Sequence, residues 1–151
     1  MAEREVVIRP LGEPGDLGWV VMKHGEIYAE ELSFDASFEA FVARVVADYH
    51  DGREGGPQAA WIAEADGVRA GSIFCVPADD RTAKLRLLIV DPVARGLGLG
   101  GRMVERCLQF RAVLGAGGRR PRLPGTGGRL PPCRRPRCQR PRRSCSGPPG
   151  H

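Results

Sequence analysis

The run Arg-Gly-Leu-Gly-Leu-Gly at residues 95–100 constrains this chain more than any other feature. It follows an apolar, strand-like stretch at residues 84–90, and it begins a helix-like segment with one apolar face formed by Met103, Val104, Cys107 and Leu108. The first N–H groups of a helix have no partner within the helix, and glycines let a ligand approach them closely. Because the helix dipole also favours negative charge there, the run predicts a cradle for a phosphate or pyrophosphate group.

Two phosphate-binding motifs fit these glycines. Gly96, Gly98 and Gly101 satisfy G-x-G-x-x-G, the dinucleotide fingerprint. That fingerprint follows its strand directly and has an acidic residue about 20 positions later. Here residues 91–95 intervene, and no Asp or Glu occurs after Glu105. The dinucleotide interpretation therefore fails on both counts.

The second motif is R-x-x-G-x-G, which Arg95, Gly98 and Gly100 satisfy. With Leu88 and Val90 ahead of it, the segment resembles the acetyl-CoA signature of the GCN5-related N-acetyltransferases (GNAT family). The resemblance implies acetyl-CoA as co-substrate, with its pyrophosphate held by loop amides. The implied binding residues are Leu88, Val90, Arg95, Gly96, Leu97, Gly98, Leu99, Gly100, Gly101 and Arg102. An ordinary glycine-rich turn is the alternative.

The preceding residues predict a strand, two helices and three further strands. Residues 5–9 alternate as a strand does, whereas residues 17–28 and 38–49 have apolar side chains at helical spacing. Asp16 is expected to cap the first helix, and Asp35 or Ser37 the second.

The three later strands are marked by a turn and by alternation. Residues 61–65 and 68–76 flank Asp66-Gly67, which is a strong hairpin signal. In residues 84–90 apolar side chains occupy most positions, which predicts a substantially buried strand. Cys75 and Cys107 each stand alone in an apolar segment and are expected to be buried.

This order is that of the first part of the acetyltransferase fold. The resemblance implies an α/β fold, a GNAT-like mixed sheet with flanking helices, truncated after the helix that follows the acetyl-CoA loop. The chain is most similar to the acetyltransferase half of bacterial fusions with a MarR-type regulator. The segments that carry this likeness are residues 16–21, 24–25, 28–29, 61–64, 71–72 and 83–88. The regulator's winged helix-turn-helix domain has no counterpart here, so DNA regulation is not carried over.

Charge divides the chain at about residue 110. Residues 1–110 hold 12 Lys and Arg against 18 Asp and Glu, a net charge of −6, whereas residues 111–151 hold 11 Arg and no acid, giving +11 and a total of +5. The second segment also has 8 Gly and 8 Pro and few aliphatic residues. We therefore expect residues 1–110 to be the N-terminal portion of the acetyltransferase domain and 111–151 to be a disordered tail. A shift of reading frame near residues 110–112 would explain this composition.

The tail contains two kinds of candidate ligand-binding residue, arginines and cysteines. Its arginines favour weak, nonspecific contact with phosphates, but no aromatic side chain is interleaved for base stacking. Cys133, Cys138, Cys145 and His151 have spacings that match no familiar zinc site, so no metal is expected.

The predicted activity is transfer of an acetyl group from acetyl-CoA to an amine of a small molecule or protein, impaired by the altered C-terminus. The alternatives are a non-catalytic remnant, or a basic nucleic-acid-binding protein acting through the arginine-rich tail. No catalytic residue is assigned: Glu26, Glu30, Glu31 and Glu64 are conceivable bases but fit solvated carboxylates better, and His24 with Tyr28 fits a packed helix face. The chain lacks a membrane span and a signal core, so a cytoplasmic location is expected, with self-association through an open sheet edge.

Overall fold

The helices and strands follow the predicted order. The computed structural model describes residues 3–116. Strand β1 (Val6–Pro10) leads into the helices α1 (Asp16–Leu32) and α2 (Ala36–His50). The strands β2 (Ala59–Ala65), β3 (Val68–Pro77) and β4 (Ala83–Val90) follow, and then the 3-10 turn η1 (Pro92–Ala94) and helix α3 (Leu99–Ala116). Helix α3 continues past Phe110, and the rest of the predicted tail, residues 117–151, lies outside the described residues.

The described strands form one antiparallel sheet in the order β1-β2-β3-β4. The predicted hairpin joins β2 to β3, with Ala65 opposite Val68. Both turn residues are left-handed, at φ 53° for Asp66 and 76° for Gly67, as a two-residue hairpin turn requires. The α/β fold class with flanking helices is therefore confirmed.

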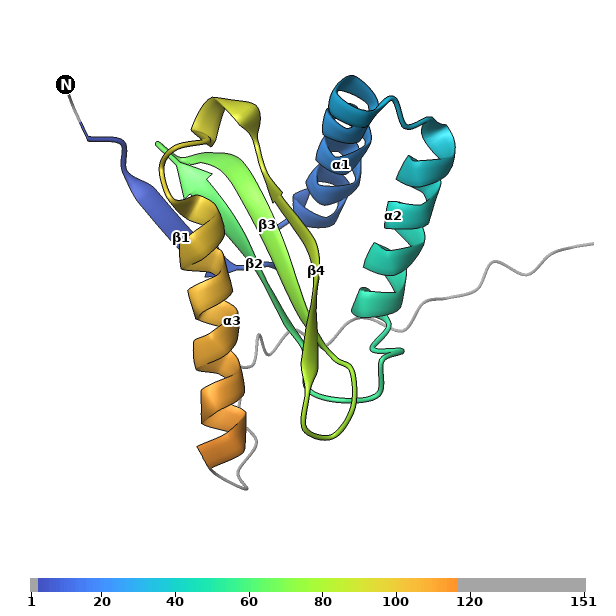
Figure 1. The fold of residues 1–151 in the computed structure, drawn as a ribbon, viewed down its shortest axis with the longest axis vertical. Helices are drawn as coiled ribbons and strands as arrows, with labels where there is room; N and C mark the ends of the chain where they lie inside the picture. Colours follow the sequence, from blue (N-terminus) through green and yellow to red (C-terminus); the bar gives the residue numbers. More distant parts are fainter. Residues whose placement is uncertain (1–2, 117–151) are drawn as a thin grey trace, which may run out of the picture. The chain divides into compact units, whose positions relative to one another are not determined.

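Helices cover both faces of this sheet (Figure 1). Alternate residues of a strand point to opposite faces. Trp61 and Ile73 accordingly belong to the core under α3, together with Met103. Ile62 and Phe74 belong to the second core, under α1 and α2, where they meet the buried valines Val20, Val42 and Val46.

The apolar face of α3 is narrower than predicted. Met103 and Cys107 are buried and Val104 packs beside them, but Leu108 is 65% exposed. The expectation for Leu108 was wrong because a helical repeat cannot show how wide a stripe the sheet covers. Cys75 and Cys107 are both buried, as predicted.

Strand β4 carries a bulge that changes the predicted burial. Ser72 lies opposite Ile89 and Phe74 opposite Arg86, so β4 has one residue more than β3 between these pairs. The extra residue lies at Leu87, whose φ is +50°, and the buried Ser72 hydroxyl donates to the Leu87 carbonyl at 2.8 Å. Residues beyond the bulge therefore point to the opposite faces from those that strict alternation predicts.

The prediction of a substantially buried β4 was therefore wrong. Only Ile89 is fully buried there, while Leu85 and Leu88 are 45% and 41% exposed. Leu87 packs with the core under α1 and α2. Part of the reason for the exposure is position, because β4 is the last strand of the described sheet and pairs there only with β3.

The start of α1 is held by a buried carboxylate. The N-cap of α1 is Gly15, which makes no side-chain cap, so the prediction that Asp16 caps this helix was wrong. Asp16 is fully buried and accepts two hydrogen bonds from the Arg9 guanidinium of β1, at 2.8 and 2.9 Å, and one from Arg69 of β3 at 2.8 Å. The backbone N–H groups of Gly12 and Glu13 also donate to Asp16. The cap of α2 was predicted correctly, because the Asp35 carboxylate accepts from the Ser37 backbone.

These contacts determine the charge state of Asp16. Burial by itself raises the pKa of a carboxyl group, but the hydrogen bonds from Arg9, Gly12, Arg69 and Glu13 outweigh it and hold the pKa of Asp16 well below its ordinary value of 3.8. Asp16 is therefore ionised at neutral pH, and it joins β1, β3 and α1 at one point.

We expect Asp16→Asn to lower the free energy of unfolding by about 3–5 kcal/mol, because an amide removes the buried negative charge that Arg9 and Arg69 share and leaves only Arg9 with other carboxylates, Glu64 and Glu13. Urea denaturation at pH 7 measures the loss. Glu13→Gln is the matched control: Glu13 also pairs with Arg9, at 3.4 Å, but its side chain is 64% exposed. Such an exposed pair contributes less than about 1 kcal/mol. Equal losses in the two variants would contradict the central role of Asp16.

The same variant has a defined pH dependence. Because the pKa of Asp16 is lower in the folded than in the unfolded state, its stabilisation is complete above about pH 4–5 and is lost as the pH falls below that range. The difference between wild type and Asp16→Asn should accordingly be constant from pH 7 to 5 and shrink under more acidic conditions.

Candidate functional site

The glycine loop begins at a turn anchored to α1 and β3. Asp91 is almost fully buried; its backbone N–H donates to the Ala70 carbonyl at 2.8 Å and its carboxylate accepts from the Val93 N–H at 3.1 Å. The same carboxylate pairs with Lys23 of α1 at 3.1 Å. Hydrogen bonds from Lys23 to Asp91 and Glu26 raise the pKa of Lys23, so the amino group stays charged. These contacts fix where the loop leaves β4.

The alternation of leucine and glycine gives the loop two sides. Leu99 is buried and Leu97 packs against the core under α3, so the leucines anchor the loop. Gly96 and Gly98 have φ values of 88° and 71°, a left-handed conformation that favours glycine. A Cβ placed on Gly96, Gly98, Gly100 or Gly101 would meet no atom within 4 Å, so the space beside the glycines is open.

The loop amides at the start of α3 are free to bind a ligand. The first helical contact here is from the Arg102 N–H to the Gly98 carbonyl, at 3.2 Å. Among hydrogen bonds between described residues, none has a backbone N–H of residues 96–101 as its donor. A helix start with unpaired amides and open space is the geometry that binds a phosphate.

Two arginines flank these amides. Arg102 is exposed and makes no ion pair with any residue in the described range. The Arg95 Nη1 lies 2.6 Å from the Glu31 Oε1 of α1, and both side chains are about half exposed. The hydrogen bond with Glu31 raises the pKa of Arg95, which keeps the guanidinium charged. The loop therefore combines backbone donors with two positive charges.

The remaining predicted residues lie on the strand before the loop. Val90 faces the core under α3 and Leu88 is partly exposed beside the bulge. Beyond its pairing with β3, β4 has an outer edge whose backbone groups have no strand partner within residues 3–116. The predicted residues thus lie along one stretch of chain from β4 through the loop into α3, with Val90 and Leu99 turned into the core.

Sequence reasoning missed the residues that hold the loop in place. No sequence pattern indicates that Lys23 or Asp91 anchors the loop, and the sequence predicts Glu31 only as a conceivable base that fits a solvated carboxylate better. In the structure Glu31 pairs with Arg95, Glu26 with Lys23, and Glu64 with Arg9 at 2.7 Å. Glu31 and Glu64 are distant in sequence from their partners, so no local pattern identifies these two pairs, whereas Glu26 stands three residues after Lys23, a spacing at which helical side chains meet.

His24 is a packed residue, as favoured from the sequence. It is 2% exposed, its Nδ1–H donates to the Val20 carbonyl at 2.8 Å, and its ring stacks on Tyr28. Burial lowers the pKa of His24, so the ring is neutral. The Nε2 atom has no hydrogen-bond partner among the residues that the structure describes.

Within the described part of the chain, no cluster of side chains could hold a metal ion and no helix is long and apolar enough to cross a membrane. The four cysteine and histidine residues considered for zinc lie outside that part.

Comparison with known proteins agrees with this geometry. The sequence matches the profile of the acetyltransferase (GNAT) family over residues 19–119, and the chain belongs to this family. No curated protein matches it. The GCN5-related N-acetyltransferase from Ralstonia eutropha is 25% identical, with a TM-score of 0.56 over 74% of this chain and 78% of that one.

Two further solved structures share the fold. An acetyltransferase from Streptococcus agalactiae is 23% identical, with a TM-score of 0.55 over 72% of this chain and 66% of its own length. A GNAT family acetyltransferase from Brucella melitensis, solved in complex with acetyl-CoA, is 19% identical, with a TM-score of 0.58 over 75% of this chain and 72% of that one. The chain thus spans just under two thirds of the Streptococcus protein.

We expect Gly98→Val to weaken binding of CoA at least about tenfold, because a branched side chain would occupy the open space beside the amides and displace charge-assisted hydrogen bonds. Isothermal titration calorimetry with CoA measures this effect.

Gly52→Val is the matched control for backbone strain. Gly52 has a φ of 69° and open space around its Cβ, but it follows α2, away from the glycine loop in sequence. Both variants should lose a similar roughly 1–2 kcal/mol of stability from the left-handed backbone. Equal CoA affinities in wild type and Gly98→Val would rule out the loop as the binding site.

Proposed function

We propose that this chain binds acetyl-CoA at Arg95–Arg102 and transfers its acetyl group to an amine of a small molecule or protein. The observation that carries the proposal is the set of unpaired loop amides at the start of α3, facing open space between two arginines. Family membership supports acetyl-CoA as the ligand. The backbone of Gly96, Gly98, Gly100 and Gly101 would hold the pyrophosphate, and Arg95 and Arg102 would balance its charge.

Strand β4 would hold the arm that carries the acetyl group. Leu88 and Val90 lie at the end of β4, which residues 91–94 separate from the loop, and the outer edge of β4 offers backbone donors and acceptors to an extended amide-containing chain. Acetyl-CoA supplies the acetyl group as a thioester. In the transfer the amine nitrogen bonds to the acetyl carbon and the carbon–sulfur bond breaks. The nitrogen loses a proton to solvent, and the CoA thiolate that leaves takes up a proton from solvent to become the thiol.

We further propose that the C-terminal segment impairs this activity. Residues 111–151 carry a charge of +11 and lack the apolar periodicity of another strand and helix. A change of reading frame accounts for that composition, and translating the underlying DNA in all frames tests it. We also propose that the chain descends from a MarR–GNAT fusion and that it is cytoplasmic. The tail would bind phosphate groups weakly. A non-catalytic remnant is the alternative.

The purified chain should transfer acetyl groups far more slowly than a complete family member, and it should self-associate through β4. An open apolar edge recruits other chains, and Leu85 on this strand is 45% exposed. Light scattering after size-exclusion chromatography gives the oligomeric state, and thiol release from acetyl-CoA gives the rate.

A charged side chain on the edge strand β4 separates self-association from slow acetyl transfer. Leu85→Lys should reduce self-association, whereas Val68→Lys should leave it unchanged, because Val68 is 68% exposed on β3, at the hairpin. Fast transfer by a monomer would disprove the impairment, while activity found only in the oligomer would mean that a second chain completes the sheet.

A further inference from the structure

The side chains of β4 follow an order of faces that is the same from either end of the strand. Arg86 pairs with Phe74 of β3, which belongs to the core under α1 and α2. Ile89 pairs with Ser72, two residues before Phe74, so Ile89 faces the same way. Leu87, the extra residue at the bulge, packs with that core as well.

The other positions of β4 alternate with these. Ala83 and Val90 pack with the core under α3, and Leu85 pairs with a buried residue of the same core. Lys84 lies between two residues of this set and faces the opposite way, and Leu88 faces α3 because both its neighbours face α1 and α2. From one end of β4 to the other the order is α3, α1–α2, α3, α1–α2, α1–α2, α3, α1–α2, α3, which is symmetric about the centre of the strand.

This symmetry suits pairing with a second copy of β4. Residues directly opposite each other in an antiparallel pair lie on the same face. A second copy turned by 180° places Leu85 beside the partner's Leu88 and Ala83 beside the partner's Val90, with every pair on matching faces. A strictly alternating strand would point residues 85 and 88 to opposite faces, so the bulge permits this register. Because the contact is two-fold and uses one edge of each chain, it closes as a dimer.

The exposed groups on the edge favour the same register. Leu85 and Leu88 are 45% and 41% exposed, and pairing would cover both. The Glu54 carboxylate lies 3.2 Å from the Lys84 Nζ and 3.5 Å from the Arg86 Nη1, so each chain carries a counter-charge for its own cations. In this register each of these cations lies opposite an apolar residue of the partner, and no cation directly opposes another.

Residues 117–151 of this chain suit the edge less well than a second copy does. Strand β4 has eight residues without Pro or Gly, whereas no run longer than five residues lacks both in residues 117–151. Pro cannot donate to a neighbouring strand, and Gly weakens a strand. A second copy of this chain is therefore the partner that the edge fits best.

We propose that β4 pairs with β4 of a second copy, and that this dimer and the arm of acetyl-CoA exclude each other. The inference rests on the proposed function, which places that arm along the outer edge of β4. The backbone groups of one strand edge hydrogen-bond with one extended chain at a time. The dimer is thus a closed form of the acetyl-CoA site, and acetyl-CoA opens it by binding the monomer.

Analytical ultracentrifugation of the full chain over a range of concentrations measures the dissociation constant of the dimer. Saturating CoA should raise that constant at least about tenfold, because pairing must displace its arm. Adenosine diphosphate is the matched ligand, since it has the pyrophosphate but no arm. It should leave the dissociation constant within about twofold of its value without ligand.

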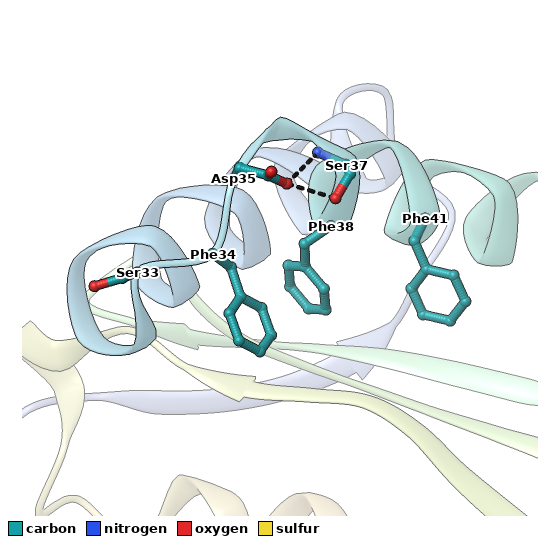
Figure 2. Close-up of a pocket in the computed structure, with 6 residues that line it drawn as sticks. All are labelled: Ser33, Phe34, Asp35, Ser37, Phe38 and Phe41. Carbon is teal, nitrogen blue, oxygen red and sulfur yellow. Dashed lines mark hydrogen bonds between the residues drawn. The ribbon is translucent and has the colours of Figure 1, made fainter.

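Leu85→Lys should make the chain monomeric, and Phe41→Lys is its matched control. Phe34, Phe38 and Phe41 point to the same side of the α1–α2 connection (Figure 2), where Phe41 is 54% exposed. That surface is apolar too but has no strand edge, so the dimer should persist in Phe41→Lys. Leu85→Lys should bind CoA more tightly than wild type where wild type is dimeric, and equally well where wild type is diluted to the monomer.

The outcomes are distinct. Dissociation by CoA but not by adenosine diphosphate supports the proposal, and this comparison needs wild type alone. A dimer that binds CoA without dissociating, a wild type that stays monomeric, or a dimer that Phe41→Lys breaks and Leu85→Lys does not, overturns it. If monomeric Leu85→Lys binds no CoA in calorimetry while wild type still dimerises, the acetyl-CoA site is rejected together with the exclusion, and the β4 dimer alone stands.

Discussion

The buried Asp16 carboxylate is the contact on which the position of α1 depends. It receives Arg9 from β1, Arg69 from β3 and the loop amides of Gly12 and Glu13, so the helix starts at a fixed point on the sheet. From there α1 runs for 17 residues, roughly 25 Å, and its later turns carry Lys23 and Glu31. These two side chains contact Asp91 and Arg95. A charge network at one end of the helix thus positions the glycine loop at the other.

The sequence predicted those parts of the fold that depend on neighbours along the chain. The Asp66-Gly67 hairpin, the Asp35 cap and the order of elements required only local turn chemistry and periodicity. The errors concern residues whose environment is set from elsewhere. Asp16 had the residue type and position of a helix cap, but it is buried and forms ion pairs with Arg9 of β1 and Arg69 of β3. Leu108 fitted the helical repeat, but the sheet does not reach it.

The candidate site divides in the same way. The glycine loop could be predicted because Arg95–Arg102 is contiguous and its conformation needs glycine at φ values of 88° and 71°. The exposure of the phenylalanines at the α1–α2 connection could not be predicted. Phe38 and Phe41 fit the apolar face of α2, and a periodic pattern gives no sign that Phe41 is left half exposed. The pairing of Glu31 with Arg95 joins two helix-flanking segments and has no signal in either.

The extra residue at Leu87 decides which face of the sheet Asp91 reaches. Arg86 and Ile89 are three positions apart on β4, but their partners Phe74 and Ser72 are two apart on β3, so both pairs lie on one face. If β4 kept its length but alternated strictly from Arg86 onward, the side chains of Val90 and Asp91 would exchange faces. Asp91 would then turn away from Lys23, and the glycine loop would start from the wrong side of the sheet. The hydrogen bond from the Ser72 hydroxyl to the Leu87 carbonyl, at the bulge itself, therefore bears on the glycine loop although neither residue belongs to it.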